Sequence, residues 1–396
     1  MTDKNLKKVF YITLIVCVLI IIVEAIYFGY KKYKFEMNNT YYDNYNMTIK
    51  DKDNLVSVGS SYFKYSKNNK YTDGIEKGKL IKFDKNNDIV FEYQYDKELR
   101  STFTSVISVD DGYIVTGSGE YSEYQHENNL RDAFLIKFDK NGKKIWEKYY
   151  GQLANTRFNK AILVDEGIIA IGTSLYENME VGNHTNGGGI IVKYDFDGNE
   201  IWHNNHGGNK TGSFNDVIVI NDDIYVCGKD GADSGNIVKY TSDGKYVWHK
   251  NYSFTDGKGH QALTYFNDKI YVATSKKILE DEKAEKRITT NTEALILEYD
   301  LKGNLTNEVT AGGKNYERLT GITYKNDNLY VIGTTSSTKD FLKVELQESE
   351  EDLTTGLVLK FDKNLKLIDK KSLGGTNNDS LTNIMLFDNT LYISVS

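Results

Sequence analysis

Two segments carry the residue types of a calcium-binding loop. Asp139-Lys-Asn-Gly142 and Asp195-Phe-Asp-Gly198 place carboxylate and amide oxygens just before a glycine. An EF-hand loop needs further oxygen ligands and a distal glutamate at fixed positions, and neither segment has them in register. Each segment lies between two alternating apolar runs, where Asp, Asn and Gly form tight turns. The pattern therefore favours hairpin turns, and we predict no metal site and no cofactor.

Histidines are the other candidate metal ligands. His203 and His206 follow Trp202, and His249 holds the place of His203 one repeat later. Because residues at equivalent places in successive repeats lie far apart, structural or surface roles are favoured over a shared zinc ion. His206 and His260 fall in connections between repeats, so a ligand role for either of these two stays open as an alternative.

No nucleophile stands with a base and an orienting group in a recognisable pattern. Cys227 has apolar neighbours in a strand-like segment, which predicts a buried, inert thiol. Cys17 lies in an N-terminal apolar run, so we expect no disulfide between the two cysteines. The net charge of -7 argues against a nucleic-acid partner. We predict no catalytic residues.

Two kinds of hairpin alternate along the chain and would position any site. One kind reads IKFDKNGKKIW and recurs at the anchor positions Asp84, Asp139, Asp195, Thr241, Asp300 and Asp362. The other reads VDDGYIVTG and closes at Gly59, Gly117, Gly172, Gly228, Thr274, Gly333 and Val395. The chain contains no proline, so its turns must come from Asp, Asn and Gly.

The spacing of these hairpins is regular. A residue seven places after each anchor is followed 26 residues later by a closing position, as from Phe91 to Gly117. A unit of four short antiparallel strands with this length is typical of a propeller blade. We therefore predict an all-β β-propeller of six complete blades plus a partial seventh. The seventh either takes a strand from the segment near Tyr33, or the sequence stops short of completing it.

The repeat also predicts which residues build the blades and which form a binding face. Structural positions within the blades are Phe91, Trp146, Trp202, Trp248, Gly117, Gly172, Gly228 and Gly333. Long insertions between the second and third strands fall at 60–78, 120–133, 174–188, 275–294 and 334–356, all on one face. Candidate binding residues in these loops are Tyr62, Tyr71, Tyr121, Tyr124, His126, Tyr176 and His184. The alternative is that the loops are tolerant, solvent-exposed insertions.

An apolar run near the N-terminus predicts a membrane anchor. Residues 9–30 are long enough to cross a bilayer as a helix, after a cytoplasmic tail at 1–8. Bulky residues after Glu24 favour an uncleaved anchor over a secretory signal. The lysines that flank the run are equal in number on both sides, but a short N-terminal tail favours a single-pass protein with residues 31–396 outside the cell.

The repeat, with its KYDxDGNxxW hairpin, a following Gly-Gly and a DDxIYVxG hairpin, resembles the bacterial seven-bladed propeller repeat proteins. More loosely it resembles the quinoprotein-like propellers, over about residues 33–396. The quinoprotein dehydrogenases would imply a quinone cofactor, calcium and adjacent cysteines. This sequence has no adjacent cysteine pair, so that activity is not carried over.

The sequence therefore predicts a membrane-anchored, non-catalytic propeller that binds a surface protein or a glycan through the long loops. Its second partner would be the lipid bilayer, through residues 9–30. An alternative is a cell-surface glycan hydrolase or lyase with carboxylates in the central funnel. A third is an assembly scaffold of opposite orientation.

Overall fold

The computed structural model describes residues 40–395, apart from stretches at 68–69, 96–99, 121–129, 152–154, 179–182, 208–211, 233, 254, 279–290, 314, 338–340, 343–353 and 375–378. The chain divides into two compact units. The smaller unit contains residues 1–43 and 61–76, and the larger contains 44–60 and 77–396. The larger unit holds most of the propeller.

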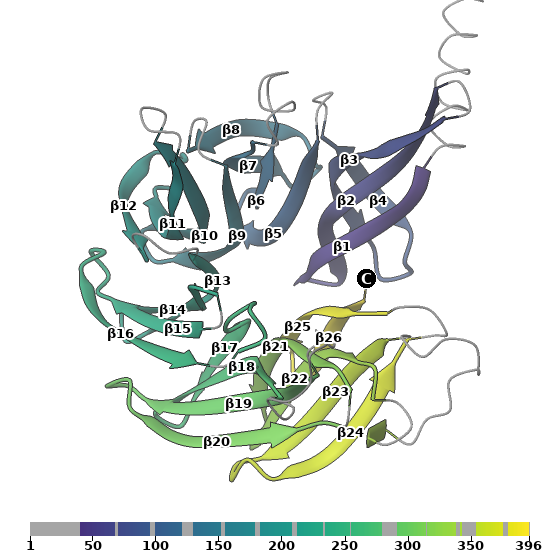
Figure 1. The fold of residues 1–396 in the computed structure, drawn as a ribbon. Coiled ribbons are helices and arrows are strands. Elements are labelled where there is room, and N and C mark those ends of the chain that lie inside the picture. The colour runs from purple at the N-terminus through teal and green to yellow at the C-terminus, as the bar shows by residue number, and fades with distance from the viewer. Residues whose placement is uncertain are drawn as a thin grey trace, which may run out of the picture. The chain divides into compact units, whose positions relative to one another are not determined.

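Six sheets have four strands each and are numbered as blades in chain order (Figure 1). Blade 1 contains β1 (Thr40–Asp51), β2 (Asn54–Lys67), β3 (Lys70–Phe83) and β4 (Ile89–Gln94). Blade 2 contains β5 (Ser101–Val109), β6 (Gly112–Gly119), β7 (Asp132–Asp139) and β8 (Lys144–Tyr150). Blade 3 contains β9 (Thr156–Val164), β10 (Gly167–Asn178), β11 (Asn183–Tyr194) and β12 (Glu200–His206).

The remaining strands continue the same order. Blade 4 contains β13 (Gly212–Ile220), β14 (Asp223–Asp230), β15 (Ser234–Tyr240) and β16 (Tyr246–Ser253). Blade 5 contains β17 (Ala262–Phe266), β18 (Lys269–Lys277), β19 (Thr292–Asp300) and β20 (Leu305–Ala311). Blade 6 contains β21 (Glu317–Lys325), β22 (Asn328–Thr335), β23 (Thr355–Asp362) and β24 (Leu367–Leu373). A two-stranded sheet of β25 (Leu381–Phe387) and β26 (Thr390–Val395) comes after blade 6.

Each blade is an antiparallel meander in which neighbouring strands pair in chain order. Burial follows position in the sheet. The second strand β6 is buried along its whole length, whereas the outer strand β8 is only partly buried. A strand covered on both faces reads as a near-continuous apolar or small-residue run, which explains the YIVTG pattern of the second strands. The cores lie between consecutive blades, as where Val58 and Leu80 of blade 1 pack with Phe103 and Phe134 of blade 2.

The anchor aspartates form the turns between third and fourth strands. In blade 2 the Asp139 Oδ1 atom accepts hydrogen bonds from the backbone N–H groups of Asn141 and Lys143, both at 2.9 Å. Gly142 then adopts a positive φ of 81°, which costs glycine no steric strain. The same pair of bonds recurs at Asp84, Asp195, Asp300 and Asp362. The carboxylates that suggested calcium loops are therefore hairpin caps.

The first strand of each sheet, called its inner strand, carries in most sheets a β-bulge opposite the closing position of the hairpin. In β5, β9, β13, β21 and β25 the register shifts by one residue, which leaves one residue of each inner strand unpaired. The unpaired residues are Thr104, Asn159, Asn215, Thr320 and Thr382. A Cβ at Gly117, Gly172, Gly228 or Gly333 would lie 1.8–2.1 Å from a backbone carbonyl oxygen of the bulged strand. Glycine closes these hairpins because no side chain fits beside the bulge.

The structure corrects the predicted fold class. Among the described residues, no helix is both long and apolar enough to cross a membrane. The predicted anchor at 9–30, together with Cys17 and Tyr33, lies outside the described residues. The predicted partial seventh blade is wrong, because β25 and β26 form a two-stranded sheet and no described hairpin adds further strands to it. The fold is an all-β propeller with six four-stranded blades.

Two of the predicted loops are also corrected. The segment 60–78 lies almost wholly in β2 and β3, and the segment 174–188 lies largely in β10 and β11. The pairing of β10 with β11 continues from Ser174↔Gly188 to Asn178↔Asn183. The polar and glycine-rich composition suggested a loop, but cross-strand backbone hydrogen bonds extend the hairpin regardless of side-chain type. Most of the predicted loop at 275–294 lies outside the described residues, because these leave out 279–290.

Candidate functional site

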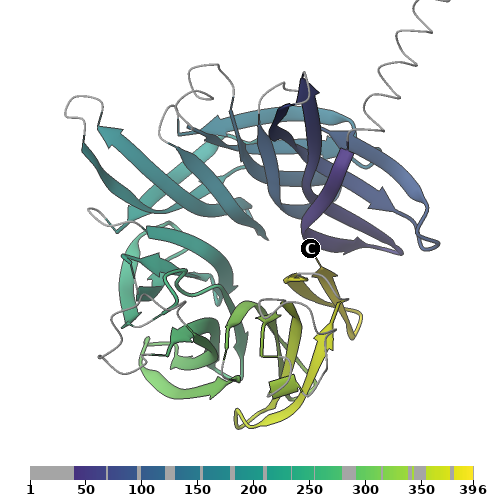
Figure 2. The ribbon, with the colours of Figure 1, turned by 45° about the vertical axis from the view of Figure 1, so that its right-hand side comes forward.

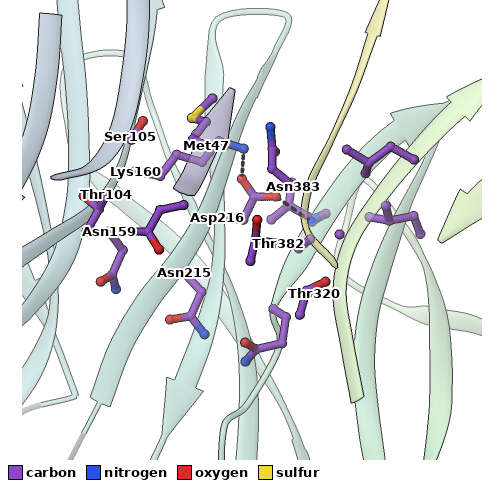
Figure 3. A pocket seen from close by; sticks show the side chains of 17 residues that line it. Met47, Thr104, Ser105, Asn159, Lys160, Asn215, Asp216, Thr320, Thr382 and Asn383 are labelled. Atoms are coloured by element: carbon purple, nitrogen blue, oxygen red, sulfur yellow. Dashed lines mark hydrogen bonds and ion pairs between the residues drawn. The ribbon is translucent and has the colours of Figure 1, made fainter. Parts of the chain in front are cut away.

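A polar cavity of about 170 Å³ lies where the inner strands meet (Figure 3). Every inner strand, including β25, contributes to its lining. The lining side chains are mostly amides and hydroxyls, and they include Asn46, Thr104, Ser105, Asn159, Lys160, Asn215, Asp216, Gln261, Thr320, Thr382 and Asn383. Apart from Asn46, which lies midway along β1, these residues lie toward the starts of their strands or just before them. The cavity therefore lies in one half of the propeller's central channel. This is the half near the connections from the fourth strand of one blade to the first strand of the next.

Asn46 and the unpaired bulge residues link neighbouring inner strands around this cavity. Each of these side chains donates a hydrogen bond to a backbone carbonyl in the next inner strand along the chain, or within two residues before that strand begins. The bonds run from Asn46 to Phe103 (2.7 Å), Thr104 to Phe158 (2.7 Å), Asn159 to Phe214 (2.7 Å), Asn215 to His260 (2.8 Å) and Thr320 to Leu381. We call this series the amide–hydroxyl belt. Each of these bonds gives a backbone carbonyl a hydrogen-bond partner that it would otherwise lack once it is buried away from water.

The belt also joins the two ends of the described chain. Thr382 Oγ1 in β25 donates to the Tyr45 carbonyl in β1 at 3.1 Å, and Asn383 Nδ2 donates to the Thr48 carbonyl at 3.3 Å. Figure 2 shows the C-terminal sheet beside β1. The two-stranded sheet therefore completes the wall of the cavity although it has no outer strands among the described residues.

The belt is interrupted in blade 5. Gln261 stands at the belt position, but its amide donates to the carbonyls of Lys258 (2.9 Å) and Gly259 (3.1 Å) in its own loop. The inner strand β17 pairs with β18 without a bulge and begins only at Ala262. With no bulge to turn it toward the next strand, the Gln261 side chain bonds locally.

One ion pair lies in the cavity wall. Lys160 of blade 3 donates to the Asp216 carboxylate of blade 4. Asp216 also accepts the backbone N–H groups of Val217 (2.8 Å) and Leu263 (2.9 Å). The Asp216 side chain is 8% exposed and that of Lys160 is 31% exposed. The pair brings one positive and one negative charge to the cavity wall, and the three donors fix the Asp216 carboxylate in place.

This arrangement bears on the predicted glycan hydrolase. Glycoside hydrolysis by the usual route requires two carboxyl groups about 5–10 Å apart. Among the described residues that line the cavity, Asp216 is the one carboxylate. Lys160 and two backbone amides occupy its oxygens, and no second carboxyl group lies beside it in this lining, which suits a structural anchor better than a catalytic pair.

Most of the loop residues predicted as a binding face cannot be placed at the cavity. Tyr62, in the smaller unit, stacks on Tyr42 with ring centroids 4.7 Å apart and donates to Glu76 Oε1 at 3.1 Å. Tyr71, Tyr176 and His184 lie on β3, β10 and β11, with side chains outside the described set. Tyr121, Tyr124 and His126 lie outside the described residues.

The aromatic residues of the fourth strands lie between blades. Phe91, Trp146, Trp202 and Trp248 are partly buried against the interblade cores. A turn glycine of the following blade covers each ring, as Gly198 covers Trp146 and Gly244 covers Trp202. These side chains therefore seal neighbouring blades together, away from the cavity.

The histidines and Cys227 have separate surroundings. His203 Nδ1 lies 2.6 Å from Glu200 Oε1, whereas the rings of His206 and His249 lie 5.1 Å apart across blades 3 and 4. Burial lowers the pKa of His206, and the nearby His249 lowers it further. Among the described residues, no group of three or more His, Cys, Asp or Glu is placed to hold a metal ion. Burial raises the pKa of the Cys227 thiol.

His260 has an unusual place next to the cavity. It stands where blades 2, 3 and 4 carry Phe103, Phe158 and Phe214, and its ring lies over Gly235 as Phe214 lies over Gly189. The side chain is fully buried, and neither ring nitrogen has a hydrogen-bond partner. Burial therefore lowers its pKa to about 3.

Sequence reasoning missed the belt and the ion pair, although a signal was present. The triplets Phe103-Thr-Ser, Phe158-Asn-Lys and Phe214-Asn-Asp stand at the same place in three repeats. A polar pair directly after a buried aromatic breaks the alternation expected of a strand. That break marks the bulge, and the bulge turns both polar residues toward the channel.

No family model matches the chain, and no curated protein matches it either. Solved structures with a similar fold include one titled "Structure of Dos1 propeller", with 11% identity over 90% of this chain and 91% of that one and a TM-score of 0.49. Hydrazine synthase of Kuenenia stuttgartiensis has 10% identity over 80% and 89%, with a TM-score of 0.48. A GH43 endo-arabinanase from Bacillus licheniformis has 11% identity over 67% and 97%, with a TM-score of 0.34.

At such low identities and TM-scores these structures carry no argument about function. The six four-stranded sheets of this structure support the resemblance to repeat propellers at the level of propeller architecture, with six blades in place of seven. Nothing in the comparisons supports the finer likeness to quinoprotein-like propellers.

Proposed function

We propose that this propeller is a binding module that receives a neutral, hydroxyl-rich group of a glycan in its central cavity. The observation that carries the proposal is the composition of the wall, in which amides and hydroxyls outnumber the apolar side chains and surround one ion pair. Amide and hydroxyl groups pair well with sugar hydroxyls, because both sides donate and accept.

The belt leaves hydrogen-bonding capacity for a ligand. An asparagine amide has two N–H donors and an acceptor oxygen, and Asn159 uses one donor for the Phe214 carbonyl. Its second donor and its oxygen can then serve a ligand. Asn46 and Asn215 have further contacts, because the Asn46 amide also lies 3.5 Å from Thr102 Oγ1 and the Asn215 oxygen accepts from Ser213 Oγ at 3.1 Å. Because the belt bonds hold the side chains in place, little side-chain entropy would be lost on binding.

The size of the cavity limits what it accepts. A volume of about 170 Å³ is below the roughly 300–1,000 Å³ of typical ligand pockets. The cavity suits a single terminal sugar unit of a longer molecule rather than a whole chain. The rest of a glycan would then contact the face where the longer loops emerge, which retains the predicted role of that face.

The test is binding of neutral, acidic and basic oligosaccharides to the full chain, followed by saturation-transfer NMR. We expect contacts from the terminal unit of a neutral glycan only. Asp216→Asn leaves Lys160 uncompensated, so it should weaken neutral ligands several-fold and favour acidic ones. Asp369→Asn, on the outer strand β24, is the matched control and should bind as the wild type does.

Two results would contradict the proposal. Equal binding of neutral glycans by the wild type and the Asp216→Asn variant would remove the cavity from the interaction. Release of reducing sugar by the wild type but not by Asp216→Asn would favour a hydrolase over a binding module.

A further inference from the structure

A second cavity lies between blades 3 and 4, on the face opposite the long loops. It measures about 420 Å³. Its apolar wall includes Leu163, Val164, Val219 and Ile224, and its polar rim includes Asp165, Glu166, Asp222, Lys193 and Ser242. We call it the interblade crevice. Leu163 is 48% exposed and Val219 is 40% exposed, so the opening presents apolar surface to solvent.

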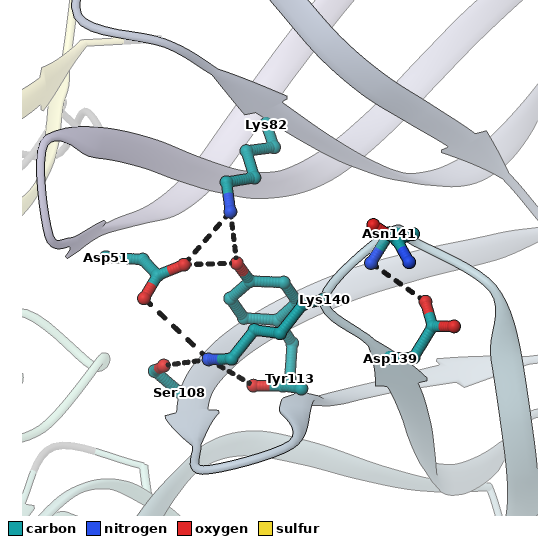
Figure 4. Close-up of polar contacts among 8 residues, drawn as sticks. Asp51, Lys82, Ser108, Tyr113, Asp139, Lys140 and Asn141 are labelled. Atoms are coloured by element: carbon teal, nitrogen blue, oxygen red, sulfur yellow. Dashed lines mark hydrogen bonds and ion pairs between the residues drawn. The ribbon is translucent and has the colours of Figure 1, made fainter.

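The repeat shows what occupies this place between other blades. Between blades 1 and 2 the equivalent residues are Asp51, Lys82, Ser108, Tyr113 and Lys140, which Figure 4 shows as one connected cluster. The Tyr113 hydroxyl donates to Asp51, and Lys82 Nζ donates to Asp51 (3.0 Å) and to the Tyr113 oxygen (2.8 Å). Lys140 Nζ lies over the Tyr113 ring, 4.7 Å from its centroid, and donates to Ser108 Oγ at 3.1 Å.

This first junction therefore holds an aromatic ring of its own. Burial opposes ionisation of Asp51, but hydrogen bonds from Tyr113 and Lys82 outweigh it and hold the pKa of the carboxyl below its usual value. The ring has a lysine over its face and a charged pair at its hydroxyl, so residues of the chain itself surround it at this junction.

Other junctions also carry an aromatic side chain at one of these positions. Phe196 takes the place of Lys140 between blades 2 and 3, and Tyr265 takes the place of Ser108 between blades 4 and 5. Between blades 5 and 6, Phe266 and Tyr324 stack on each other. Only the junction of blades 3 and 4 has no aromatic residue at any of the equivalent positions among these five interfaces of four-stranded blades.

The crevice is open because its residues are small. Val164 replaces Asp51, Val219 replaces Ser108, Ile224 replaces Tyr113 and Ser242 replaces Lys140. The lysine is kept: Lys193 stands in the place of Lys82, with its Nζ 3.7 Å from Glu166 Oε2. The space that a tyrosine ring fills at the first junction is thus vacant here, with a lysine still beside it.

We propose that the interblade crevice binds an aromatic side chain, tyrosine in the first instance, supplied by a partner peptide with basic residues on either side of it. The apolar wall takes the ring, and Lys193 and Ser242 lie near its hydroxyl as Lys82 does for Tyr113. The exposed carboxylates of Asp165 and Asp222 at the rim attract the flanking cations. Rings of this kind are the usual anchors of protein interfaces.

The test titrates three acetylated tripeptide amides, Lys-Tyr-Lys, Lys-Ala-Lys and Glu-Tyr-Glu, into the full chain. Methyl NMR signals of Leu163, Val219 and Ile224 report binding. We expect Lys-Tyr-Lys to shift these signals and to bind at least tenfold more tightly than either of the other peptides. Equal affinities, or shifts confined to other parts of the protein, would overturn the proposal.

Variants then separate the crevice from the rest of the surface. Ser242→Phe places a ring where blade 3 carries Phe196, so binding of Lys-Tyr-Lys should fall at least tenfold. Ser242→Ala keeps the space and removes only the hydroxyl group, so it should lower the affinity far less than Ser242→Phe does. If Ser242→Phe loses its dispersed methyl spectrum, Ser242→Leu gives the same test, because blade 5 carries Leu301 at this place. Unchanged binding by a folded, filled variant would refute the site.

The rim is tested separately. The double variant Asp165→Asn with Asp222→Asn should reduce the affinity for Lys-Tyr-Lys to that for a neutral peptide of the same shape, and the loss should shrink in high salt. Retention of the full preference for Lys-Tyr-Lys over Glu-Tyr-Glu in this variant would contradict the assigned charge recognition.

Discussion

Gly198, in the turn between β11 and β12 of blade 3, lies against Trp146, on the outer strand β8 of blade 2. A Cβ on residue 198 would come within 2.9 Å of the indole ring. The same contact joins Gly142 to Phe91, Gly244 to Trp202 and Gly303 to Trp248. The two most visible residues of the repeat, its turn glycine and its outer-strand aromatic, therefore form one contact between successive blades.

This contact predicts the effect of Gly198→Ala. The residue has a φ of 76°, which L-residues with a Cβ adopt at a cost, and the new methyl group meets the Trp146 ring. We expect a loss of about 1–3 kcal/mol in the free energy of unfolding, measured by urea denaturation. The double variant with Trp146→Ala should lose less than the sum of the two single changes. Strict additivity would show that the two residues act independently.

In the turn of blade 6, Leu365 stands where the turns of blades 2 to 5 have glycine. It keeps a positive φ of 60° and is 3% exposed, and the equivalent residue of the preceding outer strand is Asn307 instead of a tryptophan. We infer that the leucine takes up the space that an indole fills elsewhere. Leu365→Gly should therefore destabilise the protein by about 2–4 kcal/mol, although glycine removes the backbone strain of the positive φ at this residue.

A compensating change tests that reasoning. Asn307→Trp combined with Leu365→Gly should recover part of the stability lost by Leu365→Gly alone, as read from thermal unfolding. If the tryptophan gives no recovery in the glycine background, the two positions do not share the space.

The cavity ion pair predicts a second coupling. Lys160→Met leaves the Asp216 carboxylate, which is 8% exposed, with its backbone donors alone. We expect a loss of about 1–3 kcal/mol, because a buried charge without its partner carries a desolvation cost. Adding Asp216→Asn to this variant should restore part of the loss. Chemical denaturation of the single and double variants measures the coupling. A double variant with a lower free energy of unfolding than both single variants would contradict the predicted coupling.

His260 predicts how stability changes with pH. The folded protein keeps the ring neutral down to a pKa of about 3, whereas an unfolded histidine takes a proton near pH 6.5. Between these values the unfolded state binds more protons, so stability falls as pH falls, by about 1.4 kcal/mol for each unit below 6.5. His260→Phe introduces the residue type that blades 2, 3 and 4 carry at this place. This variant should lose this part of the pH dependence.

The measurement compares unfolding of the wild type and His260→Phe from pH 7 to pH 4. Carboxylates contribute equally to both proteins, so the difference between the two curves isolates His260. His203→Gln, at an exposed histidine, should follow the wild type. Parallel curves for the wild type and His260→Phe would show that the ring is not kept neutral by burial.

The sequence alone determined the local structure. The Asp139 pattern predicted a capped hairpin turn, and the constant spacing from Phe91 to Gly117 predicted four-stranded blades, both of which the structure confirms. These features repeat because each is settled within a few residues, by turn chemistry and by strand alternation. Composition was a poorer guide at 174–188, where polar and glycine residues lie largely in paired strands.

Only the tertiary structure decided which residues meet. Lys160 and Asp216 lie 56 residues apart, and Thr382 and Tyr45 lie 337 apart, yet both pairs form hydrogen bonds around one cavity. Such contacts leave no periodic signal, because they depend on how one blade stacks against the next. The same holds for the crevice between blades 3 and 4. Val219 and Ser242 are ordinary strand and turn residues, and their small size matters only because Val164 and Ile224 face the same space.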